Sequence, residues 1–185
     1  MDTKISKLII TLAVIGIISA VALSFVYQWT TPYIEEHQAQ AQREAVRSVL
    51  PQAEEFEEVN RNGNTFFEGY DSGGNKIGVA MIASGPGYQN IIEIMIGVNI
   101  NDNTIYGIQI LTHEETPGLG ARITGKEYKS NFERKPFGDY TVVKRDAQTE
   151  MEVEAIAGAT ISSQSVTKIV EKAVNDIKAA YGGGA

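Results

Sequence analysis

The stretch "IIEIMIGVNINDNTIYGIQILT", residues 91–112, decides the fold. Two apolar runs within it, "IIEIMIGVN" and "TIYGIQILT", flank a polar turn at residues 100–103. Runs of this length that are rich in Ile and Val, joined by a short turn, predict a β-hairpin. Because both runs are apolar at most positions, we expect these strands in the centre of a sheet.

Elements on either side of this hairpin complete the predicted domain. The runs "TFFEGY" and "KIGVAMIAS" flank the turn "DSGGN", residues 71–75, and predict a second hairpin. A short helix is expected near residues 126–134 and a strand at residues 140–143. A final helix is expected from about Ser162 to Tyr181, because apolar residues recur there at intervals of three and four. These elements predict an α+β domain, an antiparallel sheet with helices packed on it.

The N-terminal segment has the pattern of a transmembrane helix. An uncharged, apolar run extends from Leu8 to Tyr27, which is long enough as a helix to cross the roughly 30 Å hydrocarbon core of a bilayer. Lys4 and Lys7 precede the run and Trp29 follows it, which predicts a cytoplasmic N-terminus and an extracytoplasmic C-terminal domain.

A cleaved signal peptide is the alternative for this segment. The tripeptide Ala20-Val21-Ala22 is similar to a cleavage site, but the apolar run continues to Val26. Signal peptides have apolar cores of about 7–15 residues, so a retained anchor is favoured.

The sequence therefore predicts three parts. Residues 1–29 form a cytoplasmic stub and anchor, and residues 30–51 form a helical stalk. Thr31 before Pro32 fits an N-cap and first helical residue, so we expect a new or kinked helix to begin there. Residues 52–185 form the extracytoplasmic domain.

Composition excludes several classes of function. The chain has 185 residues, 16 Lys and Arg against 23 Asp and Glu, and a net charge of −7, without a basic cluster that would bind nucleic acid. It has no cysteine, which excludes thiolate zinc sites, cysteine-bound iron–sulfur clusters and thiol catalysis. Its two histidines, His37 and His113, do not form a zinc motif.

The connection "THEETPGLGAR", residues 112–122, is longer and richer in glycine than a turn requires. Glycines allow a ligand to approach the backbone, and unpaired amides in such a loop can bind polar groups. Composition alone leaves a binding loop and an ordinary irregular loop equally open.

A second unusual stretch, "AIAGATISSQSV", residues 155–166, lies ahead of the final helix. Ser162 or Ser163 would suffice as N-cap, which leaves Thr160 without an obvious structural task. The small residues Ala157, Gly158 and Ala159 leave space beside it, and a helix N-terminus is favourable for phosphate. Spacing alone does not separate a functional Thr160 from simple capping.

The order "HEETPGLGARI" (113–123) and then "AGATISS" (157–163), behind one N-terminal anchor, resembles the extracytoplasmic FMN-binding domain family. Its members include the G subunit of the Rnf electron-transport complex, which is the more similar in length, and the C subunit of the sodium-pumping NADH:quinone reductase. In that family the threonine that ends a Ser/Thr-Gly-Ala-Thr motif carries FMN through a phosphoester bond, and a flavin transferase installs it from FAD. The matching residue here is Thr160.

The resemblance implies further cofactor-binding residues around covalent FMN. The amides from Ile161 to Ser163 and the hydroxyls of Ser162 and Ser163 would surround the phosphate. Residues 157–159 would keep the backbone open for the ribityl chain. The isoalloxazine would be lined by Glu115, Thr116, Leu119 and Gly120.

The implied function is that of an electron carrier rather than of a self-contained enzyme. The carrier would be a single-pass protein of the cell (inner) membrane, in contact with lipid and with the other subunits of an Rnf-type complex. That complex couples electron transfer between ferredoxin and NAD to ion transport. Two alternatives stay open: an anchored sensor module that binds flavin or another ligand non-covalently, and a purely structural assembly subunit.

Overall fold

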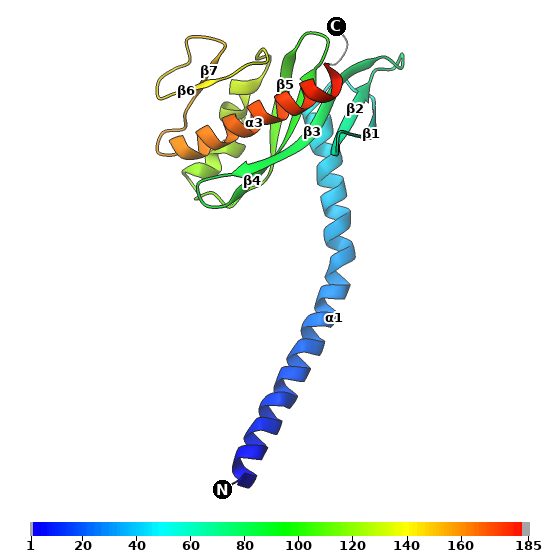
Figure 1. Cartoon of the computed structure of the whole chain (residues 1–185), viewed down its shortest axis with the longest axis vertical. Coiled ribbons are helices and arrows are strands. Elements are labelled where there is room, and N and C mark those ends of the chain that lie inside the picture. The colour runs from blue at the N-terminus through cyan, green and yellow to red at the C-terminus, as the bar shows by residue number, and fades with distance from the viewer. Residues whose placement is uncertain (1, 183–185) are drawn as a thin grey trace. The chain divides into compact units, whose positions relative to one another are not determined.

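The computed structural model describes residues 2–182, so Met1 and the last three residues of the expected domain 52–185 lie outside the described part. The chain forms two compact units, residues 1–41 and residues 42–185. The expected α+β class is confirmed: a long apolar helix precedes a five-stranded antiparallel sheet with packed helices (Figure 1).

The first helix, α1 (Asp2–Val49), contains the apolar run of residues 8–27. Among the described residues it is the helix that is long and apolar enough to cross a membrane. Of the two expectations at Thr31 and Pro32, a new helix is wrong, since α1 continues through Pro32, and a kink stays a prediction. Thr31 Oγ1 does not cap a helix start; it donates a hydrogen bond of 2.7 Å to the carbonyl of Tyr27, one turn earlier.

The sheet is a meander of five antiparallel strands in sequence order. Its strands are β1 (Glu55–Arg61), β2 (Asn64–Tyr70), β3 (Lys76–Pro86), β4 (Ile91–Asn99) and β5 (Thr104–Thr112). Both predicted hairpins are confirmed, as β2–β3 and β4–β5. The expectation that both strands of the second hairpin are central is right for β4 and wrong for β5, which lies at the edge of the sheet. The sequence interpretation missed β1, which joins β2 through Asn62 and Gly63, both with positive φ as a two-residue hairpin turn requires.

The helix α3 (Thr160–Tyr181) covers one face of the sheet (Figure 1). Its apolar stripe packs on alternate residues of the strands, such as Ile94 and Ile96 of β4, which are fully buried. Three short segments, η1 (Gly120–Thr124), α2 (Lys126–Lys129) and η2 (Ser130–Phe132), add Ile123, Tyr128 and Phe132 to this core.

The opposite face of the sheet packs against the last turns of α1, within residues 42–185. Val46, Val49 and Leu50 contact Phe67 and Met95 there in a second apolar cluster. Gly97 of β4 permits this approach, because a Cβ at that position would overlap the backbone carbonyl of Val49. The expected boundary between stalk and domain at residue 52 stays a prediction.

A buried carboxylate fastens the C-terminal end of α3 to the sheet. Glu68 of β2 is 3% exposed and accepts hydrogen bonds of 2.8 Å from the hydroxyls of Tyr70 and Tyr181. It also forms ion pairs with Arg61 and Lys76. Burial by itself raises the pKa of Glu68, but the hydrogen bonds from Lys76, Tyr70 and Tyr181 outweigh it and lower the pKa to about 2.

We predict that Glu68 makes the free energy of unfolding depend on pH in the acidic range. Its pKa falls from 4.5 to about 2 on folding, so its contribution is complete above pH 4.5 and is lost as the pH falls towards 2. Glu68→Gln should cost about 1–3 kcal/mol at pH 7 and flatten this pH dependence. Thermal unfolding of the detergent-solubilised chain between pH 7 and 2 measures both effects. Glu57→Gln, an exposed residue opposite Glu68 in the β1–β2 register, is the control and should leave the profile unchanged.

Candidate functional site

A cavity of about 1120 Å³ lies at the N-terminal end of α3. Both unusual stretches of the sequence contribute to its lining, although residues 123–154 separate them in the chain. The lining residues are Tyr88, Glu115, Thr116, Leu119, Gly120, Arg122, Gly125, Glu127, Tyr128, Ser130, Asn131, Lys144 and residues 154–162.

The first turn of α3 forms one wall of this cavity. The helix begins at Thr160 with Ala159 at the N-cap position, and no side chain caps it. The expectation that Ser162 or Ser163 caps the helix is therefore wrong. The amide of Ser163 bonds to the carbonyl of Ala159 at 3.0 Å, so the expectation that it surrounds a phosphate is wrong. The amides of residues 160–162 precede this bond and have no partner within the helix, so they and the hydroxyl of Thr160 are available at the cavity wall.

Neither serine caps the helix, but each stabilises the helix start: Ser162 through a hydrogen bond to Glu115, and Ser163 through contacts with the chain around Thr160. Ser163 is fully buried; its Oγ accepts a hydrogen bond of 3.0 Å from the amide of Ile156 and donates one of 3.0 Å to the carbonyl of Ala159. Its own carbonyl accepts a hydrogen bond of 3.0 Å from the buried hydroxyl of Tyr128. These contacts fix the path of the chain immediately before and after Thr160.

Glu115 joins three separate segments at the cavity. Its Oε1 accepts hydrogen bonds from the amides of Tyr88 (2.7 Å) and Gln89 (3.1 Å), in the loop between β3 and β4. Its Oε2 accepts one of 2.5 Å from Ser162 Oγ, in the first turn of α3. Burial by itself raises the pKa of Glu115, but the hydrogen bonds from Ser162, Gln89 and Tyr88 outweigh it, so the pKa lies below its ordinary value. The buried carboxylate therefore stays charged at neutral pH.

Two glycines give this arrangement its space. A Cβ at Gly120 would lie 2.5 Å from Glu115 Oε2 and 2.8 Å from Ser162 Oγ, so a side chain there would separate the two groups. Gly158 has a φ of +81°, which only glycine adopts readily, and a Cβ on it would lie 3.1 Å from Leu119 Cδ2. The two motifs thus come close together where these glycines have no side chain.

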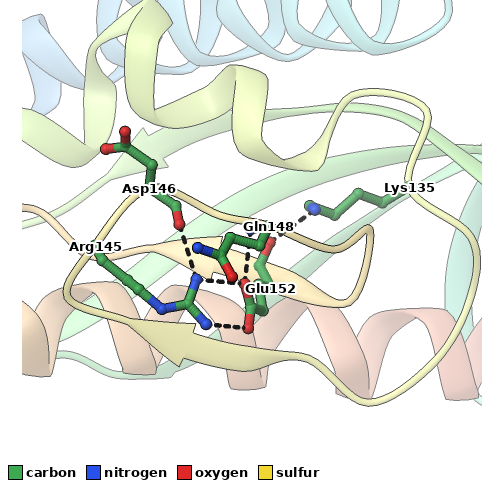
Figure 2. Close-up of polar contacts among 5 residues, drawn as sticks. All are labelled: Lys135, Arg145, Asp146, Gln148 and Glu152. Atoms are coloured by element: carbon green, nitrogen blue, oxygen red, sulfur yellow. Dashed lines mark hydrogen bonds and ion pairs between the residues drawn. The ribbon is translucent and has the colours of Figure 1, made fainter.

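The strand β7 (Glu152–Glu154) leads directly into the lining segment 154–162, and it pairs in parallel with β6 (Thr141–Val143). Figure 2 shows the contacts that stabilise this small sheet. The two terminal guanidinium nitrogens of Arg145 donate hydrogen bonds of 2.9 and 2.7 Å to the carboxylate of Glu152. The backbone amide of Gln148 donates a third, of 2.8 Å, to the same carboxylate. Lys135 donates to the carbonyl of Glu152 at 2.8 Å.

These contacts lower the pKa of Glu152 to about 2, mainly through Arg145. They also fix the chain next to Lys144, whose cationic side chain lines the cavity.

The structure brings together most residues that the sequence resemblance implied. Lining the cavity are Glu115, Thr116, Leu119, Gly120 and residues 157–162. Ser163 is the exception, because its buried hydroxyl bonds to Ile156 and Ala159 and does not reach the cavity. Sequence reasoning missed the contributions of Tyr88, Tyr128, Asn131 and Lys144, which reach the cavity through the tertiary fold. It also assigned no role to Arg122, although this residue lies in the first motif.

Known protein families match both parts of the chain. The N-terminal region of the Rnf G subunit matches residues 1–49, and an FMN-binding domain matches residues 87–175. The G subunit of the ion-translocating oxidoreductase complex of Methanosarcina acetivorans is 38% identical over 98% of this chain and 99% of its own. The chain belongs to the family of G subunits of Rnf-type complexes.

Other relatives of this chain carry more specific names. The G subunit of the proton-translocating ferredoxin:NAD(+) oxidoreductase complex of Clostridium ljungdahlii is 32% identical and covers 90% of this chain and 88% of its own. The G subunit of the corresponding Na(+)-translocating complex of Acetobacterium woodii is 32% identical, over 91% and 89%. Among solved structures, NqrC of Shewanella oneidensis matches with a TM-score of 0.55 and 22% identity over 70% of this chain and 73% of its own, which shows a shared fold.

The cavity fits FMN in three respects. The available amides of the first turn of α3 are suited to a phosphate, and Arg122 and Lys144 add positive charge among the lining residues. Gly158 and Ala159, both small residues, line the cavity beside Thr160, which leaves space for an extended chain. Leu119 and Tyr88 supply apolar surface for a planar ring.

We predict that Gly120→Ala damages the site through overpacking. The added methyl group would separate Ser162 from Glu115, at a cost of about 1–3 kcal/mol in the free energy of unfolding. Chemical denaturation of the full chain in detergent measures this cost. Gly107→Ala is the control, because a Cβ there has no atom within 4 Å; an equal loss in both variants would contradict the assignment.

Proposed function

We propose that this chain is the membrane-anchored flavoprotein subunit of an Rnf-type complex and carries FMN covalently on Thr160. The observation that carries the proposal is the position of Thr160: the first residue of an uncapped helix, at the wall of a cavity where both motifs converge. The flavin would accept and donate electrons. The protein would hold it, tune its potential and present it to other subunits.

The residues around Thr160 suit attachment of a phosphate. The amides of the first turn of α3 and the positive end of the helix dipole would stabilise the phosphoester anion. Attachment by a flavin transferase would form a bond from Thr160 Oγ to the FMN phosphorus of FAD, with AMP as leaving group and loss of the hydroxyl proton. Covalent attachment keeps the cofactor with a domain that lies outside the cytoplasm, where a lost flavin could not be recovered.

The remaining residues would have separate tasks. Thr116, Leu119 and Gly120 would line the isoalloxazine, and Gly158 and Ala159 would leave room for the ribityl chain. Glu115 would fix the loop that contacts the ring to the helix that contacts the phosphate. The segment from Leu8 to Tyr27 would anchor the chain in the cell membrane, with the N-terminus in the cytoplasm.

Relatives of this chain support the place of the carrier within a complex. The Clostridium and Acetobacterium proteins are named as subunits of ferredoxin:NAD(+) oxidoreductases that translocate protons and sodium ions, respectively. We infer that this chain passes electrons within a complex of the same kind. Ion transport itself would belong to other subunits, since the span of residues 8–27 has no acidic or basic side chain to form a path.

We predict that Thr160→Val abolishes covalent flavin. Valine keeps the shape of threonine and lacks the oxygen that forms the ester. Each variant is produced with an active flavin transferase, and flavin fluorescence is measured in the denatured protein band. The wild type should fluoresce and Thr160→Val should not.

Thr116→Val is the matched control, because it removes another hydroxyl that lines the same cavity and should leave the fluorescence intact. A dark wild-type band, with the transferase active on another substrate, would contradict covalent attachment. Native protein that is yellow but loses its colour on denaturation would favour the non-covalent module instead.

A further inference from the structure

Within the described residues, the cationic side chains that line the cavity are Arg122 and Lys144, and they belong to different walls. Lys144 directly follows β6, whose last residue, Val143, accepts a hydrogen bond of 2.8 Å from the amide of Ala155. Lys144 therefore lies beside the segment that leads to Thr160. Arg122 lies instead at the end of the loop that the proposed function assigns to the isoalloxazine.

Arg122 and the residues that would line the ring form one compact turn. The carbonyl of Thr116 accepts hydrogen bonds from the amides of Leu119 (3.2 Å) and Ala121 (3.1 Å). The carbonyl of Leu119 in turn accepts one of 3.1 Å from the amide of Arg122. In a 3₁₀-helix, side chains three residues apart lie on the same side. This agrees with the cavity lining, which contains the side chains of both Leu119 and Arg122.

The guanidinium of Arg122 is available to a ligand. Within residues 2–182 its side chain is exposed and takes part in no hydrogen bond, ion pair or ring contact. Other arginines of the domain are paired, Arg61 with Glu68 and Arg145 with Glu152. Arg122 therefore keeps all its donors, and its positive charge is not neutralised by a carboxylate of the described chain.

The other charged residue of the same loop that lines the cavity is an anion. Glu115 is 4% exposed, and its hydrogen bonds keep its pKa below the ordinary value, so it is charged at neutral pH. A fixed negative charge beside a ring opposes the addition of electrons to that ring. Arg122 is the residue of this loop that lines the cavity and can offset this effect.

We infer that Arg122 raises the reduction potential of the flavin by holding a positive charge beside the isoalloxazine. This inference rests on the proposed function and names the residue responsible for part of the tuning. Reduction at neutral pH takes two electrons from a redox centre of the complex and one proton from water, and leaves one negative charge on the ring. The neighbouring guanidinium stabilises this anionic form and has little effect on the neutral oxidised form, so reduction becomes more favourable.

Redox titration of the full chain tests the role of Arg122. The chain is matured with a flavin transferase and solubilised in detergent, and flavin absorbance is recorded against potential at pH 7 and low salt. Arg122→Gln should lower the ratio of reduced to oxidised flavin at a fixed potential roughly tenfold, equivalent to about 30 mV for a two-electron couple. Arg122→Lys keeps the charge and should keep most of the wild-type potential.

Lys126→Gln is the matched control. Lys126 is an exposed cation of α2 that does not line the cavity, so its removal changes the net charge equally without removing a charge beside the ring. Its potential should equal that of the wild type. Salt provides a second readout, because exposed charges are screened within about 3 Å at 1 M salt and about 30 Å at 0.01 M. The difference between wild type and Arg122→Gln should therefore shrink at 1 M salt.

Several results would overturn the role of Arg122. They are equal potentials in wild type and Arg122→Gln, an equal shift in Lys126→Gln or Arg122→Lys, and a difference that salt does not reduce. Loss of flavin from Arg122→Gln would also overturn it, since Arg122 would then act in attachment.

Flavin fluorescence of the denatured wild-type band, measured on the same preparation, separates this inference from the proposed function. A dark band would overturn covalent attachment and the inference with it. A fluorescent band with equal potentials would overturn the inference alone.

Discussion

The buried carboxylate of Glu115 is the interaction on which the site depends. It is 4% exposed and accepts hydrogen bonds from Tyr88, Gln89 and Ser162, on two segments that are distant from it in sequence. A buried charge is costly unless it is hydrogen-bonded, and each of its donors would itself lose a partner without it. The carboxylate therefore fixes the cavity loop and the start of α3 in one arrangement.

This arrangement explains why the first turn of α3 remains open. Ser, Thr, Asp or Asn is preferred at a helix N-cap, where its side chain accepts from the first amides, but here Ser162 bonds to Glu115 and Ser163 bonds to Ile156. Both hydroxyls stabilise the surroundings of the helix start without covering it. Thr160 is then left at the cavity wall with available amides beside it, which is the environment that a phosphoester requires.

Stability and function are separated along α3. Its C-terminal end is fastened to the sheet by the bond from Tyr181 to Glu68 and by the edge-to-face contact of Tyr181 with Phe66, 5.4 Å between ring centres. Its N-terminal end carries the proposed attachment site. A rigid helix, fixed at the far end and along its apolar stripe, holds the cofactor site in a defined position relative to the sheet.

The sequence was most informative where local patterns determine structure. Apolar runs and turn residues predicted the strands β2 to β5, and the spacing of Val166, Ile169 and Val170 predicted α3. The polar strand β1 was missed, because "EFEEVNR" has little apolar alternation and gains its structure by pairing with β2. The N-cap was assigned wrongly for a similar reason: the acceptor that Ser162 selects, Glu115, lies 47 residues away in the chain.

In the candidate site, too, local motifs could be predicted from the sequence and tertiary contacts could not. The two motifs could be recognised from the sequence, whereas Lys144 reaches the cavity only because Arg145 and Glu152 hold the adjacent strand pair. Tyr88 reaches it through the bond of its amide to Glu115. Such residues are placed by tertiary contacts and leave no periodic signal in the sequence.

The central claim is that Thr160, and no other hydroxyl of the first turn, carries the flavin. Trypsin cleaves after Arg145 and Lys168, which places Thr160, Ser162 and Ser163 in one peptide, residues 146–168. Fragmentation of this peptide by mass spectrometry, from protein matured with a flavin transferase, locates the modification. The account predicts one FMN phosphate on Thr160 with both serines unmodified. Flavin on Ser162 or Ser163, or an unmodified peptide from flavin-loaded protein, would contradict it.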